Sequence, residues 1–384
     1  MSIRVAVRPK LLRWARERSG IDNDVLVHRF PKLQEWERTN TQPTLKQLEQ
    51  FAKATHTSVG YFFLEEPPVE NVPIPDFRTV GNKHIARPSP DLLDMVYICQ
   101  QRQEWYANYA RSLHEETFSF VGSMQLTSRV EAAAEGIRDA LEFDLDHRRL
   151  MSTWTEALRN FIEQADALGV LVMVSGIVGS NTHRPLNPDE FRGFALSDSY
   201  APLIFINGAD TKAAQMFTLA HELAHIWLGE SALSDAGPIT ELTEKTNRIE
   251  LWCNKVAAEL LVPIEALRAD YRKEAGLTDE LKRLARRFKV STLVILRRIY
   301  DCGGISRAQL WKAYDEELER LRAIPRGSGG DFYNTQIVRT GRRFTSALVG
   351  STLEGQTLHR DAFRLLGFSK LSTFQELGRS LGVA

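Results

Sequence analysis

A His-Glu-x-x-His motif lies within an apolar stretch of this 384-residue chain. His221 and His225 are four residues apart, and residues with this spacing lie on one face of an α-helix, about one turn from each other. The two imidazoles can therefore bind one metal ion, and Glu222 beside them can act as a general base toward water. This combination is typical of zinc hydrolases, and peptide hydrolysis is its commonest use.

The residues around the motif predict a buried helix. Asp210-Thr211 suits an N-cap, Gly229 follows the last apolar residues, and the residues between them are apolar on nearly every face. Two imidazoles and a carboxylate buried in such a helix need a partner, and a metal ion would supply one. The alternative is an ordinary core helix with two hydrogen-bonded histidines.

A tetrahedral catalytic zinc needs a third protein ligand and leaves one position for water. We favour Glu250, which opens a second apolar helix, expected from Arg248 to Pro263. The polar connection before it is long enough for the two helices to pack antiparallel. Four other acidic residues compete for this role: Asp235, Glu241, Glu244 and Glu259.

These two segments resemble the ImmA/IrrE family of metallopeptidases. The family pattern is His-Glu-x-x-His, then Glu-x-x-Ala-Asn-x-Phe-Ala-x-x-Leu-Leu-Met-Pro. Residues 217–227 and 250–263 match it with three small departures, none at a ligand position. The resemblance implies one Zn²⁺ per chain, held by the two histidines and Glu250, with Glu222 as the catalytic base. Mn²⁺ or Fe²⁺ could occupy the same ligands.

Three short apolar segments, 169–174, 191–196 and 202–207, predict a small sheet packed on the active helix. The last two resemble the strands that precede the active helix in the same family, and they could offer an edge to an extended peptide substrate. The fold class is therefore expected to be mainly α with a small β-sheet (α+β). By resemblance, residues 91–325 form a zincin-like metallopeptidase domain.

The first 64 residues predict a separate helical unit. Helices are expected at residues 10–18 and 44–52, where apolar residues recur at helical spacing. Leu-x-x-Trp-Glu at residues 33–37, the second of these helices, and Val-Gly-Tyr-Phe-Phe at 59–63 together resemble the Xre-type helix-turn-helix family. The resemblance implies that DNA is a partner of residues 1–64.

This helix-turn-helix unit is shortened and basic. Fewer residues than in the family separate its first helix from the Trp-Glu pair, and Pro31 interrupts the start of the expected recognition helix. Residues 1–60 hold 11 Lys and Arg and 6 Asp and Glu, which suits contacts with phosphates. The candidates for these contacts are Arg29, Lys32 and Arg38. The alternative is a helical bundle that packs against a partner or its own peptidase domain.

Residues 65–90 form a Pro-rich linker, and its prolines favour an extended backbone. Within it, Ile74-Pro-Asp-Phe-Arg-Thr79 resembles a segment common in fusions of Xre and ImmA/IrrE domains. This segment could anchor the linker onto the peptidase domain. A stiff spacer is the alternative.

A second helix-turn-helix pattern occupies residues 279–300, with seven Lys and Arg and two acidic residues. The ImmA/IrrE family often carries such a unit directly after its peptidase core. It either binds DNA or is a structural pair that completes the peptidase domain. We favour the structural role, because this geometry is common in helical domains.

Residues 326–384 are expected to form a small α+β module. Strands are predicted at 335–339 and 343–349, on either side of a Thr340-Gly341 turn. Helices are predicted at 358–366 and 372–381. The module could serve as a sensor or a docking unit.

Composition gives few further indications of function. The chain has 49 Lys and Arg and 49 Asp and Glu, so no net charge indicates nucleic acid, a membrane or an acidic substrate. The widely spaced Cys99, Cys253 and Cys302 favour a reducing cytosol over a disulfide framework or a cysteine zinc site. The N-terminus has no apolar signal core, and the longest apolar run, 169–179, is too short to span a bilayer. We expect a cytoplasmic protein.

The resemblance implies a zinc endopeptidase of narrow specificity that cleaves a repressor or an antitoxin-type partner and thereby controls stress, mobile-element or defence genes. A second hypothesis is a transcriptional regulator or antitoxin that binds DNA and a toxin partner, for instance a PIN-type nuclease. Its zinc site would be structural or vestigial. The intact Glu222 favours the enzyme, because a structural site needs no base.

Overall fold

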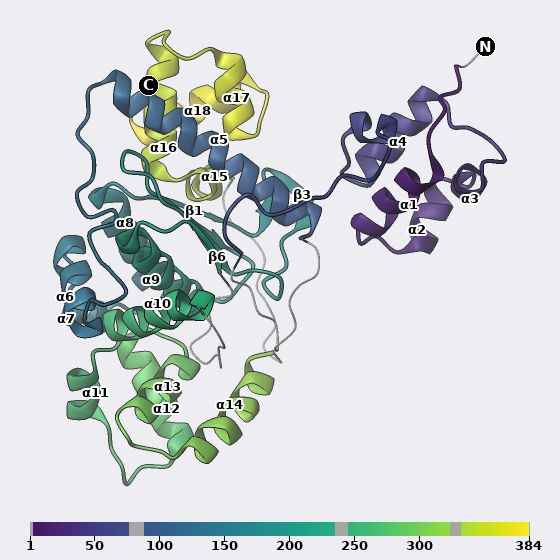
Figure 1. Cartoon of the computed structure of the whole chain (residues 1–384). Coiled ribbons are helices and arrows are strands. Elements are labelled where there is room, and N and C mark those ends of the chain that lie inside the picture. Colours follow the sequence, from purple (N-terminus) through teal and green to yellow (C-terminus); the bar gives the residue numbers. More distant parts are fainter. Residues whose placement is uncertain (1–2, 77–87, 235–244, 323–331, 384) are drawn as a thin grey trace. The chain divides into compact units, whose positions relative to one another are not determined.

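The computed structural model describes residues 3–76, 88–234, 245–322 and 332–383. These residues form two compact units. One contains the residues up to Pro73 and 88–96, and the other contains Ile74–Asp76 and the residues from Tyr97 onward. The chain is mainly helical with a small mixed sheet, which confirms the predicted fold class (Figure 1). None of the described helices is long and apolar enough to cross a membrane.

The first unit is a group of short helices around an aromatic core. Phe51 lies at its centre, with its ring 5.4 Å from that of Phe30 and 6.4 Å from that of Trp36. Thr44 forms a capping box with Gln47, which fixes the start of the predicted second helix. The elements are α1 (Pro9–Arg18), α2 (Asn23–Arg29), α3 (Leu33–Glu37), α4 (Leu45–Ala54) and the 3₁₀-helix η1 (Val59–Phe63).

The helix at the expected DNA-reading position, α3, is only five residues long. The residue before a proline is disfavoured in the α conformation, so Pro31 ends α2 at Arg29 and delays the next helix. Arg29, Lys32 and Arg38 are exposed around α3. DNA binding through this unit stays a prediction.

Ion pairs hold the beginning of the Pro-rich linker against α1. The least exposed of them joins the Arg18 guanidinium to the Glu70 carboxylate, with an Nη2–Oε1 distance of 2.8 Å. The linker is therefore attached to the first unit over these residues and is not a free spacer there. The pairs are Arg8–Glu65, Lys10–Glu66 and Arg18–Glu70.

The second unit contains a four-stranded sheet, and three of its strands overlap the three segments predicted as strands. Its order is β1 (Leu171–Ser175), β5 (Leu203–Asn207), β4 (Gly193–Leu196) and β6 (Ala232–Ser234). β1 is parallel to β5, and the other two pairs are antiparallel. Both β4 and β5 lie inside the sheet, so the expectation that they offer an edge to a substrate is wrong. Because the short strand β6 was not predicted, its pairing with β4 was not foreseen.

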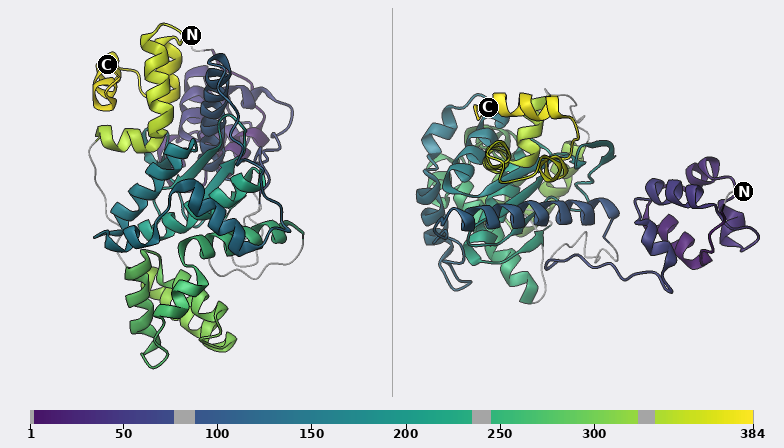
Figure 2. Two further views of the ribbon diagram at one scale, coloured as in Figure 1. Left: turned by 90° about the vertical axis from the view of Figure 1, so that its left-hand side faces the viewer. Right: turned by 90° about the horizontal axis from the view of Figure 1, so that it is seen from above.

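Helices cover both faces of the sheet (Figures 1 and 2). Val172 and Val174 of β1 belong to the core shared with α8 and α9, whereas Met173 points to the other face and contacts Arg102 of α5. A short hairpin of β2 (Ile177–Val178) and β3 (Asn181–Pro185) follows β1. The first helices of this unit are α5 (Pro90–Ser112), α6 (Val130–Leu141), α7 (Leu145–Leu150), α8 (Trp154–Leu168), α9 (Lys212–Leu228) and α10 (Lys245–Leu261).

The helices after α10 are α11 (Ile264–Asp270), α12 (Leu277–Phe288), α13 (Thr292–Asp301) and α14 (Arg307–Arg322). α12 and α13 form the helix-turn-helix pair expected at residues 279–300. Most of α13 is buried, and its Arg298 makes an ion pair with Glu259 of α10. A helix buried in this way cannot enter a DNA groove, so the geometry favours the structural role.

The C-terminal residues are helical, which corrects the predicted α+β module. The predicted strands at 335–339 and 343–349 lie in α15 (Phe332–Thr340) and α16 (Arg342–Leu353), and α17 (His359–Leu366) and α18 (Leu371–Leu381) follow. The β-branched residues suggested strands. However, buried residues recur four apart at Phe344, Leu348 and Thr352 of α16, which is a helical period. α15 and α16 pack against β1.

Candidate metal centre

Helix α9 carries the two histidines and is fixed at both ends as predicted. The Thr211 side chain accepts a hydrogen bond from the Ala214 N–H, and Gly229 ends the helix in the left-handed conformation. The helix packs against β4, β5, α8 and α10, and every side chain from Gln215 to Trp227 is buried. Packing on all sides holds the two imidazoles in one direction.

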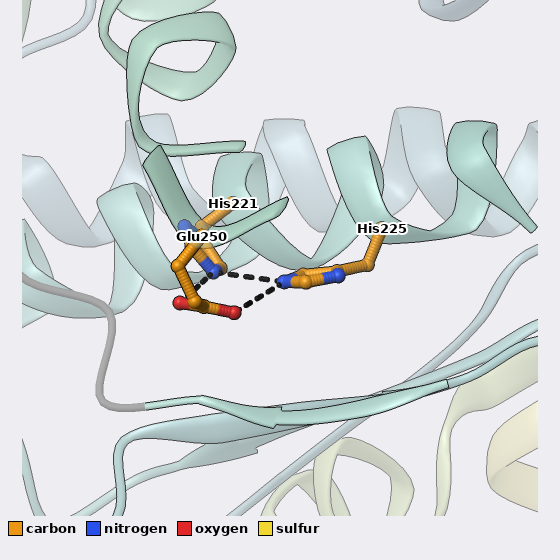
Figure 3. Close-up of side chains that lie close together, drawn as sticks. All are labelled: His221, His225 and Glu250. Carbon is orange, nitrogen blue, oxygen red and sulfur yellow. Dashed lines mark hydrogen bonds and ion pairs between the residues drawn. The ribbon is translucent and has the colours of Figure 1, made fainter. Parts of the chain in front are cut away.

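The structure brings His221, His225 and Glu250 together (Figure 3). The Glu250 carboxylate, from α10, lies 3.2 Å from His221 Nε2 and 3.0 Å from His225 Nε2. The two Nε2 atoms are 3.1 Å apart. All three side chains are buried, so three ligand atoms converge at a point that is shielded from solvent.

The spacing of these three residues fits a single metal ion. Three ligands that are each about 2.0–2.2 Å from one ion, at tetrahedral angles, lie about 3.3–3.6 Å apart. The two Nε2 atoms are 3.1 Å apart, Glu250 Oε2 lies 3.2 Å from His221 Nε2, and Glu250 Oε1 lies 3.0 Å from His225 Nε2. These separations are close to this range, and one ligand atom from each residue lies within 4.8 Å of the other two. Two imidazole nitrogens and a carboxylate oxygen also suit Zn²⁺, Mn²⁺ or Fe²⁺. The chemistry and geometry of the residues together indicate a metal site.

Burial and mutual contact strongly perturb the charges of the cluster. Although burial raises the pKa of Glu250, the charge and hydrogen bonds of the adjacent imidazoles lower it to about 2. Burial raises the pKa of Glu222 to about 8, although the charge of His221 and the nearby Ser234 hydroxyl act to lower it. Neither Glu222 oxygen has a partner with full hydrogen-bond geometry among the described residues, and a role toward a bound water would account for this buried carboxyl group.

The competing third ligands do not join the cluster within the described residues. Glu259 is nine residues beyond Glu250 on α10, where it accepts a hydrogen bond from the Ile264 N–H and pairs with Arg298. It therefore holds the C-terminal end of α10 in place. The other three, Asp235, Glu241 and Glu244, lie outside the described residues.

Two polar residues beside the ligands were missed by the sequence analysis. His221 Nδ1 lies 3.1 Å from Asn254 Oδ1, so with Nε2 directed at a metal the Nδ1–H donates to this amide. Ser234 of β6 donates to Glu250 Oε1 at 3.4 Å. Asn254 could have been found, because it lies four residues after Glu250 and hence on the same helix face. Ser234 lies in a strand that gave no comparable signal.

We expect Asn254→Ala to weaken metal binding by about 10- to 100-fold, because the substitution frees the imidazole that Asn254 orients. Asn254→Asp keeps an acceptor at the same position and is the matched control, with affinity near that of the wild type or above it. Competition with a chromogenic chelator measures both affinities. Equal affinity in the alanine variant would show that the contact does not orient His221.

Gly193 allows α9 to pack closely on β4. A Cβ atom at this position would lie 2.5 Å from Thr218 Cγ2, 2.8 Å from the Phe205 carbonyl oxygen and 3.3 Å from Glu222 Oε1. The carbonyl belongs to the neighbouring strand and cannot move aside. A larger residue must therefore push the active helix, and Glu222 with it, away from the sheet.

We expect Gly193→Ala to lower the free energy of unfolding by about 1–3 kcal/mol, as overpacking of a core does. Urea denaturation of the full chain measures this loss. Gly350→Ala in α16 is the control, since the added Cβ would meet no described atom within 4 Å and the change is expected to be neutral or slightly stabilising. A Gly193→Ala protein as stable as the control would mean that this contact is not tight.

A buried helix with His-Glu-x-x-His, joined by a carboxylate from the next helix, defines a metallopeptidase-type site. Residues 165–300 match the Peptidase_M78 family model, described as an IrrE N-terminal-like domain. This match spans the sheet and both metal-site helices, and it supports a peptidase of the ImmA/IrrE type. Residues 340–380 match a domain of unknown function, DUF8813. No curated protein matches the chain.

Proposed function

We propose that this protein is a zinc-dependent endopeptidase of narrow specificity that cleaves a regulatory protein, either a repressor or an antitoxin-type partner. The main support is the buried cluster of His221, His225 and Glu250 with Glu222 beside it. A site that only stabilised the fold would need the three ligands but no additional buried carboxyl group.

Each residue of the site has a defined role in the proposed reaction. A zinc ion in the site supplies Lewis-acid chemistry and lowers the pKa of water. Beside a cation, Glu222 would favour its carboxylate form, and the carboxylate would take the proton from the attacking water and return it to the amine of the leaving peptide. Asn254 holds the His221 ring so that Nε2 faces the ion, and Ser234 does the same for the Glu250 carboxylate. The buried surroundings exclude bulk water from these groups.

The first unit supports a regulatory substrate. It is compact and separately folded, and it presents exposed basic residues around α3. Such a unit could dock on a repressor or on the operator to which the repressor binds, and so restrict the peptidase to one target. The substrate is therefore proposed to be a protein that is recognised through a second surface as well as through its cleaved bond.

Mapping new N-termini in an extract of the source cells tests this proposal. The extract is incubated with the zinc-loaded protein and, in parallel, with a Glu222→Gln variant. A few new N-termini that appear only with the wild type, in a protein that binds DNA or neutralises a toxin, are the expected result. Cleavage of many unrelated proteins would contradict narrow specificity, and no cleavage at all would contradict the proposal that the protein is a peptidase.

A second candidate is a DNA-binding regulator whose metal site is structural. The observation in its favour is the exposed group of Arg29, Lys32 and Arg38 around α3. Absence of cleavage, together with DNA affinity that falls steeply with salt and with loss of these charges, would move the assignment to this candidate.

A further inference from the structure

The outer edge of β6 lies directly beside the metal site. β6 pairs with β4 on one side, with Leu233 opposite Phe194 and Ser234 opposite Gly193. In an antiparallel pair, alternate residues direct their main-chain groups toward the partner strand and away from it. Leu233 is the residue that faces away, because its N–H bonds to a segment other than β4. β6 can therefore accept one more strand through Leu233.

A piece of the linker occupies this edge. The Leu233 N–H donates to the Pro75 carbonyl oxygen at 2.9 Å, and Asp76 forms a parallel bridge with Leu233. The Ile74 side chain, which is 9% exposed, anchors the segment. The predicted anchoring of the Ile74-Pro-Asp segment thus has a specific form, which is β-strand addition at the end of the sheet.

The occupied position is adjacent to the metal ligands. Ser234, the next residue of β6, has its Oγ atom 3.4 Å from His225 Nε2 and 3.4 Å from Glu250 Oε1. Successive side chains of a strand point to opposite faces, so Ser234 points to the ligands while the Leu233 main chain holds Pro75. A peptide that ran along β6 would pass the reacting groups, and the linker now lies in its place.

We propose that Ile74–Asp76 is a built-in competitor, which fills the β6 edge and keeps an extended peptide away from the metal site until it is displaced. The inhibitory consequence rests on the proposed peptidase function, whereas occupation of the edge does not. Two features suit this role. The first feature is direction: the segment runs parallel to β6, whereas a peptide at the same edge could also bind antiparallel. The two directions place the carbonyl and N–H groups differently, so the segment can fill the edge without presenting its own backbone as an antiparallel peptide would.

The second feature is that the competitor is held by few contacts. Pro73 and Pro75 have no N–H, so this segment can donate little to a β-ladder. The prolines also keep the segment extended in advance, so it binds without a large loss of backbone freedom. An extended peptide with N–H groups on every residue can make more ladder bonds and replace it.

The variant Ile74→Asp tests this proposal, because a carboxylate at this buried position disfavours docking. The matched control is Val69→Asp, which makes the same change in the same linker at a side chain that is 87% exposed. Two quantities are measured on the full chain. One is amide hydrogen exchange at Leu233, and the other is the zinc-dependent rate at which a mixture of quenched-fluorescent peptides is hydrolysed. Unfolding curves check that both variants fold.

We expect Ile74→Asp to raise the exchange rate at Leu233 at least tenfold and the hydrolysis rate several-fold, with no change for Val69→Asp. A free peptide of residues 70–76, added to the Ile74→Asp variant, should restore protection of Leu233 and slow hydrolysis. This addition tests the edge even if the variant is less stable, because a peptide cannot bind to an edge that has unfolded.

The outcomes separate the two proposals. Unchanged exchange at Leu233 in a folded Ile74→Asp protein overturns the competitor, and so do equal, measurable hydrolysis rates of this variant and the wild type. If neither protein hydrolyses any peptide and the mapping of N-termini also finds no cleavage, the proposed peptidase function fails. Faster exchange that the free peptide reverses would then still support occupation of the edge by the linker.

Discussion

The Glu250→Ala variant is expected to lose metal while the wild type retains about one equivalent of zinc. Glu250 supplies one of three converging ligands and the only negative charge among them. Removal of a residue that hydrogen-bonds to a metal ligand typically lowers metal affinity by about 10- to 100-fold. Loss of a ligand itself should therefore lower metal affinity by more than about 100-fold. Two neutral imidazoles without a carboxylate would bind zinc too weakly to keep it through purification.

Elemental mass spectrometry on protein purified without added metal measures this loss. Glu265→Ala is a suitable control, because Glu265 lies on α11 and its carboxylate is exposed. A stability measurement gives a second readout, since an ion that binds only the folded state raises the free energy of unfolding. A chelator should therefore lower the unfolding temperature of the wild type and of Glu265→Ala, but leave that of Glu250→Ala unchanged.

Two results would contradict the assignment. Full zinc content in Glu250→Ala would mean that another residue completes the site, and Asp235, Glu241 and Glu244 would be tested next. A wild-type protein without zinc, manganese or iron would mean that the cluster is held by hydrogen bonds alone. The coupled charges of the imidazoles and Glu250 would then stabilise the two-helix contact directly.

The clustering of His221, His225 and Glu250 was predictable because short-range patterns specify it. The His-Glu-x-x-His spacing places two side chains on one helix face, and Thr211 and Gly229 mark the ends of this helix through local hydrogen bonds and backbone conformation. Glu250 also follows from its place near the start of an apolar helix. None of these inferences depends on how distant parts of the chain meet.

The features that were missed depend on tertiary contacts. The C-terminal residues 335–349 contain β-branched residues that suit a strand, but packing against β1 selects the helix, in which the Thr345 hydroxyl bonds back to the Gly341 carbonyl. The three-residue strand β6 is too short to give a periodic signal, and it exists because β4 and the linker pair with it. The edge of the sheet could not be located without it.

Replacement of Glu222 by glutamine should leave the metal in place and reduce hydrolysis by about 10²- to 10⁴-fold, the usual contribution of a general base. The amide has the shape of the carboxyl group but cannot accept the proton from water. Glu222 is not one of the three converging ligands, so zinc content should stay near one equivalent. This combination separates the base from the ligands, because Glu250→Ala should lose both metal and activity.

The measurement is the rate of cleavage at the sites identified by N-terminal mapping, with metal content determined on the same samples. Glu230→Gln is the matched control, since it changes an exposed carboxylate just beyond the end of α9 and should be fully active. Activity in Glu222→Gln equal to that of the wild type would remove Glu222 from the mechanism. Loss of metal in that variant would instead show that the Glu222 carboxyl group is needed to hold the site together. We do not expect this result, because the amide has the same shape and burial already raises the pKa of Glu222 to about 8, which favours an uncharged group at this position.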